Sequence, residues 1–201
     1  RRVLFRSVGK GRVGFESVHL TVRRHADLVA GIARHHLACD LVPVEGLVER
    51  LRMVKDDWEL AVLTEAGGRL SDVAKCIIPK ALAGMRERDV AAVIEAELRR
   101  AGFDKPAFDT IVASGPNSAV PHYRAGDRVL TDGDLVVMDF GGMFRGYAVD
   151  LTRTVTVGPA TDRQRRLLEG VAAAQAAAFA AIREGVPATD IDRAAREAMA
   201  Q

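Results

Sequence analysis

The stretch VVMDFGG (136–142), followed after a short connection by YAVDLTRTVTVG (147–158), carries the strongest structural pattern in the chain. Both segments are rich in β-branched and apolar residues, and glycines mark the connection between them, so the pattern predicts a β-hairpin. A turn centred on Phe144-Arg145 would place Asp139 directly opposite Asp150, on the same face of the sheet. These two carboxylates are therefore the first candidate functional residues.

Two directly opposed carboxylates repel each other, because their Cβ atoms lie only about 4.5–5.5 Å apart in an antiparallel pair. Either they share a proton, or a divalent cation lies between them. A third interpretation places one or both acids on an edge strand facing solvent. The apolar neighbours Met138, Phe140 and Leu151 favour a metal-binding or acid–base role for Asp139 and Asp150.

The third candidate residue is His122, in the segment VASGPNSAVPHY (112–123). A lone histidine is commonly a packing or surface residue, but the Gly-Pro-Asn turn and Pro121 constrain the backbone here. The nearby Ser114 and Ser118 suggest a serine hydrolase as an alternative. That alternative is weak, because the sequence has no GxSxG motif and both acids lie on the other hairpin.

Around this hairpin the sequence predicts an α+β fold. Residues 108–158 hold β-branched runs between turn motifs, which predicts an antiparallel sheet with a further strand at Val129-Leu130. Apolar residues at three- and four-residue steps predict helices on both sides of it. These helices are expected from about Asp56 to Pro79, from Glu87 to Ala101, from a capping box at Thr161 to Glu184, and from Thr189 onward.

The helices also suggest an internal repeat. Gly84 and Gly185 each stand between a long and a shorter helix, and each is followed at the same distance by Asp and a β-branched residue. A duplicated unit of two helices and a sheet would explain this. The sequence stops at Gln201 without a helix-ending signal, so we expect a truncated second unit. Residues 1–8 lack an initiating Met and are not expected to be a native start.

Composition limits the function classes. Lys and Arg number 29 against 27 Asp and Glu, with no block of like charges, so nucleic acid is not an expected partner. We identify no membrane-spanning stretch and expect no membrane partner. The two cysteines, Cys39 and Cys76, form no disulfide or zinc pattern, and a cytoplasmic location is expected.

The succession LRMVKDDWEL (51–60), VASGPNSAVPHY, VMDFGG and YAVDLTRTVTVG resembles the metal-dependent aminopeptidases with the pita-bread fold. These are the Xaa-Pro dipeptidases, aminopeptidase P and the methionine aminopeptidases. The resemblance implies a partial pita-bread catalytic domain over residues 49–201, with its first half at 56–158 and the start of its second half at 161–201. Residues 1–48 resemble the end of the creatinase-like N-terminal domain of the proline-specific members.

The resemblance also implies a function. Asp139 and Asp150 would ligate two divalent metal ions, with manganese expected and cobalt or zinc as alternatives, and the site would activate water for attack on a peptide carbonyl. His122 would contact the substrate and the transition state as a catalytic hydrogen-bond donor. The implied substrate is a peptide with proline at its second position, and the full-length protein is expected to be a homodimer.

The family completes its metal site with one His and two Glu ligands that have no counterpart before Gln201. We therefore expect this chain to be inactive by itself. Pita-bread domains also include non-catalytic binding modules and creatinase-like hydrolases, which remain alternatives. Metal content would discriminate between them, because a binding module has no need of the ions.

Overall fold

The structure is a computed structural model that describes residues 10–200, so the expectation for residues 1–8 lies outside the described part. The chain divides into two compact units, one up to Asp57 and one from Trp58 onward. Of the helices in the described part, none is both long enough and apolar enough to cross a membrane.

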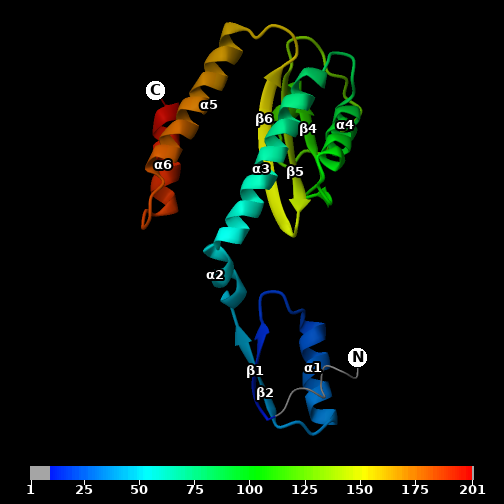
Figure 1. Cartoon of the computed structure of the whole chain (residues 1–201), viewed down its shortest axis with the longest axis vertical. Coiled ribbons are helices and arrows are strands. Elements are labelled where there is room, and N and C mark those ends of the chain that lie inside the picture. Colours follow the sequence, from blue (N-terminus) through cyan, green and yellow to red (C-terminus); the bar gives the residue numbers. More distant parts are fainter. Residues whose placement is uncertain (1–9, 201) are drawn as a thin grey trace. The chain divides into compact units, whose positions relative to one another are not determined.

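The first unit is a small βαβ arrangement (Figure 1). Strand β1 (Gly11–Glu16) pairs in parallel with β2 (Cys39–Val44), and helix α1 (Val22–Arg34) connects them. A short helix, α2 (Leu47–Met53), follows. The assignment of residues 1–48 to the end of a separate N-terminal domain stays a prediction.

The second unit opens with the two predicted helices. Helix α3 (Asp57–Ile77) passes into a single 3-10 turn, η1 (Ile78–Lys80), because Pro79 cannot continue the α-helical hydrogen bonds. Helix α4 (Glu87–Arg100) is followed by Gly102 at φ 86°, the left-handed conformation expected of a glycine at a helix end. The apolar side of α3 is buried at Val62, Ala66, Leu70, Val73, Ala74 and Ile77.

The predicted antiparallel sheet is present, with β5 (Leu135–Phe144) at its centre. Strand β6 (Tyr147–Thr156) pairs along the whole of β5, and β3 (Lys105–Pro106) and β4 (Ile111–Ser114) also pair with it. Val136, Met138 and Phe140 are fully buried against the helices. Since side chains alternate along a strand, Asp139 lies on the opposite face from this core.

The predicted strand at Val129-Leu130 is wrong. The backbone of Leu130 instead pairs with the segment that enters α4, accepting from the Gly84 amide at 2.9 Å and donating to the Met85 carbonyl at 2.8 Å. Val129 forms an isolated bridge with Arg86. The β-branched pattern did indicate extended backbone, but the partner is a loop and not the sheet.

The last two helices, α5 (Asp162–Ala181) and α6 (Ala188–Met199), lie side by side (Figure 1). The predicted capping box is confirmed: Thr161 accepts from the Gln164 amide and donates its own amide to the Gln164 side chain. Helix α5 ends before the predicted Glu184. Each helix pair is joined through a left-handed glycine, Gly84 or Gly185, in agreement with the predicted repeat.

Candidate functional site

The β5–β6 hairpin sets the positions of the two candidate ligands, and its turn differs from the prediction. The two-residue turn is Arg145-Gly146, with φ 48° and 85°, between the paired residues Phe144 and Tyr147. Positive φ at both central positions is the type I′ geometry that suits the twist of a hairpin, and glycine adopts it readily. The turn therefore lies one residue later than a centre on Phe144-Arg145.

This later turn changes the cross-strand partners. Asp139 lies opposite Thr152, and Asp150 lies opposite Gly141, so the predicted direct opposition of the two acids is wrong. Moving the turn by one residue moves each partner by two, which leaves every side chain on its predicted face. Asp139 and Asp150 are diagonal neighbours on one face of the sheet.

The two carboxyl groups remain close enough to influence each other. Partial burial, followed by the charge of Asp139 and a hydrogen bond with it, raises the pKa of Asp150 above its ordinary value. Thr152 donates a hydrogen bond from Oγ1 to Asp139 Oδ1 at 2.7 Å. This face therefore holds two neighbouring carboxyl groups, and a hydroxyl already orients Asp139.

An open cavity of about 440 Å³ lies over these acids. Asp139, Asp150 and His122 all line it, together with Phe108, Asp109, Ile111, Tyr123 and Arg124. An adjoining hollow of about 220 Å³ is also lined by His122, Asp139 and Thr152. The structure thus brings together the three residues singled out in the sequence, although His122 comes from a different segment of the chain.

Gly141 allows close packing next to this cavity. A Cβ at Gly141 would overlap the carbonyl oxygen of Val149 and the ring of Phe108, which lines the cavity. The first glycine of the pair that marked the hairpin in the sequence therefore has a packing role beside the site.

The serines that suggested a hydrolase are committed to other partners. Ser114 is fully buried and its hydroxyl donates to Glu87 at 2.7 Å, while Ser118 donates to the carbonyl oxygen of Gly115 at 2.7 Å. Neither hydroxyl is arranged as a nucleophile activated by His122. The geometry gives no support to the serine-hydrolase alternative.

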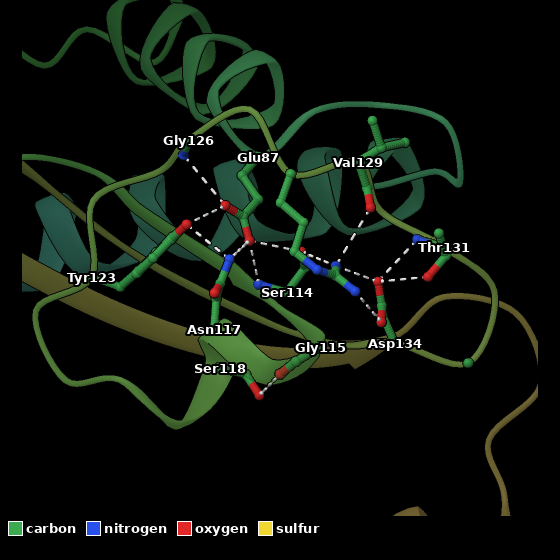
Figure 2. A network of polar contacts seen from close by, with 12 residues as sticks. Glu87, Ser114, Gly115, Asn117, Ser118, Tyr123, Gly126, Val129, Thr131 and Asp134 are labelled. Atoms are coloured by element: carbon green, nitrogen blue, oxygen red, sulfur yellow. Dashed lines mark hydrogen bonds and ion pairs between the residues drawn. The ribbon is translucent and has the colours of Figure 1, made fainter.

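A buried carboxylate, Glu87, lies beside the loop that carries His122, and the sequence pattern did not identify it. Glu87, in the first turn of α4, has no exposed surface and accepts five hydrogen bonds (Figure 2). Its Oε1 accepts from the Ser114 amide at 2.8 Å, the Ser114 hydroxyl at 2.7 Å and Asn117 Nδ2 at 3.0 Å. Its Oε2 accepts from the Tyr123 hydroxyl at 2.8 Å and the Gly126 amide at 3.3 Å.

These hydrogen bonds decide the charge of Glu87. Burial by itself would raise the pKa of Glu87, but the hydrogen bonds from Asn117, Ser114 and Tyr123 outweigh it and hold the pKa below its ordinary value. An acidic residue in the first turn of a helix usually faces solvent and interacts with the helix dipole. The sequence pattern therefore gave no sign that this one is buried.

An ion pair extends the network. Arg128 donates to both carboxylate oxygens of Asp134, at 2.6 and 2.9 Å, and to the Ser114 hydroxyl at 2.5 Å. The Arg128 guanidinium lowers the pKa of Asp134. Thr131 donates to Asp134 through its amide and its hydroxyl, so this carboxylate is fully engaged in structure.

A separate group of possible metal ligands lies in the first unit. The side chains of Glu16, His19 and Glu49 each offer a ligand atom, and these atoms lie within 4.8 Å of one another. Two of the three residues are exposed, and such groups are common on protein surfaces without a metal. His19 is therefore a suitable control residue when metal binding is assigned to Asp139 and Asp150.

The donor set at Asp139 and Asp150 suits a divalent cation. Carboxylate oxygens are ligands for magnesium, manganese and, with imidazole, zinc or cobalt. Burial and the neighbouring Asp139 charge raise the pKa of Asp150, and a cation bound between the two acids would oppose both effects. The arrangement can therefore hold a metal beside a cavity open to a substrate.

The comparisons with known proteins identify the family of the chain. The model of metallopeptidase family M24 matches residues 61–201. The chain belongs to this family. The M24 match covers both candidate ligands and His122, and it confirms the predicted membership in the metal-dependent aminopeptidases.

The curated relatives include peptidases that are named for their substrate and others that are described only as peptidases. The chain is 37% identical to the uncharacterized peptidase YqhT of Bacillus subtilis over 194 residues, which is 96% of this chain and 54% of that protein. It is 38% identical to the Xaa-Pro dipeptidase of Pyrococcus furiosus over 77% of this chain and 44% of that protein. The chain spans about half the length of the curated relatives it matches.

Solved structures confirm the fold class. The Xaa-Pro dipeptidase from Bacillus anthracis superposes with a TM-score of 0.86 at 32% identity, over 94% of this chain and 52% of that one. The prolidase from Pyrococcus furiosus gives 0.83 at 33% identity, over 94% and 54%. The fold is therefore the α+β pita-bread fold of these M24 enzymes, of which this chain covers about half.

Proposed function

We propose that this M24 chain is part of an exopeptidase that hydrolyses the bond between an N-terminal residue and proline, using two divalent metal ions. The observation that carries the proposal is the shared cavity: Asp139, Asp150 and His122 reach it from two different segments of the chain. The Xaa-Pro dipeptidases among its relatives support the substrate class.

Asp139 and Asp150 are the proposed metal ligands. They supply two carboxylates on one face of the hairpin, and Thr152 orients the first of them. Manganese is the proposed metal, with cobalt or zinc as alternatives. The chemistry supplied by the bound metal is activation of water near neutral pH for attack on the peptide carbonyl.

His122 is the proposed substrate contact. Its imidazole lies at the same cavity as the two acids but on a loop, so it can approach a bound peptide from another side. A hydrogen bond from His122 to the substrate carbonyl would stabilise the charge that develops there during attack. The proposal also includes a cytoplasmic location and a homodimer, as expected from the sequence and the resemblance.

The test compares an Xaa-Pro dipeptide with the matched Xaa-Ala dipeptide in the presence of manganese. Because the chain spans about half the length of its relatives, the assay uses the complete gene product that contains these residues, with the 201-residue chain measured beside it. We expect hydrolysis of the proline substrate by the complete product, and its loss in Asp139→Asn.

Two controls assign the metal to this site. Asp132→Asn removes an exposed carboxylate from the turn before β5, and His19→Ala removes the imidazole of the separate group in the first unit. Both variants should keep manganese binding and hydrolysis. If His19→Ala abolishes the binding while Asp139→Asn leaves it intact, the metal belongs to the first unit and the proposed centre is wrong.

A further inference from the structure

The loop that carries His122 is tied on both sides to one buried group. Residues 114–126 leave β4, pass through η2 (Gly115–Ala119) and His122, and then return toward α4. Four residues of the loop donate hydrogen bonds to the Glu87 carboxylate, two before His122 and two after it: Ser114, Asn117, Tyr123 and Gly126 (Figure 2). The carboxylate therefore closes the loop around the histidine.

The backbone at His122 needs such a constraint. His122 adopts φ 53°, in the left-handed region that residues other than glycine seldom occupy. Conformations of this kind persist where the surrounding structure holds them, and they are common at functional sites. The adjacent Tyr123 supplies a direct link, because its hydroxyl donates to Glu87 Oε2 and accepts from Asn117 Nδ2, each at 2.8 Å.

Glu87 is itself fixed in place. It is fully buried, and its backbone amide donates to the Arg128 carbonyl at 3.0 Å. The Ser114 hydroxyl stands between Glu87 and the Arg128 guanidinium, donating to the first and accepting from the second. Asp134 holds that guanidinium with two hydrogen bonds, so the carboxylate is the inner end of a rigid chain of polar contacts.

We infer that Glu87 is a positioning residue for His122, whose buried carboxylate holds the loop in the geometry that presents the imidazole to the cavity shared with Asp139 and Asp150. Glu87 does not line that cavity, so it acts through the loop. The inference rests on the proposed function, in which His122 contacts the substrate.

The test uses Glu87→Gln, which keeps the shape of the side chain but replaces one acceptor oxygen with a donor. Asn117→Ala is the second variant, because it removes one tie from the half-buried loop and leaves the buried Glu87 in place. It carries the test if Glu87→Gln fails to fold. Asp89→Asn is the matched control, an exposed carboxylate in the same first turn of α4.

In the manganese-loaded complete gene product, we expect Glu87→Gln and Asn117→Ala to lower kcat about ten- to a hundredfold, since misplacement of a contact group has effects of this size. KM and manganese affinity should change little, because the ligands lie on β5 and β6. Asp89→Asn should match the parent protein. On a His122→Ala background, Glu87→Gln and Asn117→Ala should cause no further loss, because the group that Glu87 positions is gone.

The inference is overturned if Glu87→Gln and Asn117→Ala lower kcat as much without His122 as with it, or if they weaken manganese binding. Failure of the proposed function gives a different result, in which the parent protein hydrolyses no Xaa-Pro substrate. The position of His122 is then read from its ring resonances by NMR of histidine-labelled protein. A shift in Asn117→Ala but not in Asp89→Asn supports the inference, and unchanged resonances in both overturn it.

Discussion

Thr152 lies directly across the hairpin from Asp139 and donates a hydrogen bond of 2.7 Å to its carboxylate. The position that the sequence analysis gave to Asp150 is thus taken by a hydroxyl that orients the proposed ligand. Groups that hydrogen-bond a ligating carboxylate fix its direction and tune its affinity for the metal. Because the strands pair in this register, Asp139 and Asp150 are diagonal neighbours instead of direct partners, and Asp139 accepts a hydrogen bond from Thr152.

Thr152→Val tests this role, because valine keeps the shape of the side chain and removes the hydroxyl. We expect manganese affinity to fall about tenfold, at the lower end of the effects seen for such partners. Titration calorimetry measures the change. Thr154→Val, two residues further along the same face of β6, is the control, and an equal loss in both variants would mean that the hydrogen bond has no special effect.

The proposed ligands and the proposed substrate contact should separate in their responses. Asp139→Asn should lower metal content and turnover together, whereas His122→Ala should lower turnover with the metal retained. Metal analysis beside kinetics on the same preparations checks both. A His122→Ala protein that loses its metal would refute this division of roles.

The β5–β6 hairpin shows which features could be predicted from the sequence and which could not. Alternation along β5 and β6 predicted the common face of Asp139 and Asp150, since that face depends only on the period of a strand. The pairing depended on the turn, where the choice between Phe144-Arg145 and Arg145-Gly146 rests on backbone angles that a pattern of apolar residues does not fix. Moving the turn by one residue therefore changes the residue opposite Asp139, but it leaves Asp139 and Asp150 on the same face of the sheet.

The burial of Glu87 could not be predicted from the periodicity of the sequence, for a different reason. Its donors Ser114, Asn117, Tyr123 and Gly126 lie 27 to 39 positions away in the chain, and only the packing of α4 against β4 brings them together. Local patterns describe which face of a helix is apolar. They do not identify a charged residue whose partners come from a distant loop.

Gly141 offers a test of packing at the site. Gly141→Ala should destabilise the protein, because the added methyl group would overlap the Val149 carbonyl and the Phe108 ring. Gly68→Ala is the matched control, since Gly68 lies inside α3 with open space around it, and alanine should stabilise the helix by about 0.5–1 kcal/mol. Urea unfolding measures both, and opposite signs are expected. Equal effects would show that the strand relaxes around the new methyl group.

The lowered pKa of Glu87 predicts that the free energy of unfolding depends on pH. Because its pKa in the folded protein is held below the ordinary 4.5, its ionised form stabilises the fold at all higher pH values, and this contribution is lost as the pH falls through the lowered pKa. At pH 7, Glu87→Gln should cost about 1–3 kcal/mol of unfolding free energy, since buried donors lose their acceptor. Below pH 4.5 the difference between the two proteins should shrink.

The charged and titratable groups around Glu87 keep this comparison clear. Arg128 stays charged and Tyr123 stays neutral in acid, because both side chains ordinarily titrate at alkaline pH, and the pKa of each is raised further, by Asp134 and by Glu87 respectively. Asp134 has a lowered pKa and titrates in both proteins, so its effect largely cancels in the difference. Urea unfolding from pH 7 to pH 3 gives that difference directly. A gap between parent and Glu87→Gln that stays constant to pH 3 would mean that Glu87 binds its proton equally in the folded and the unfolded protein, and it would contradict the lowered pKa.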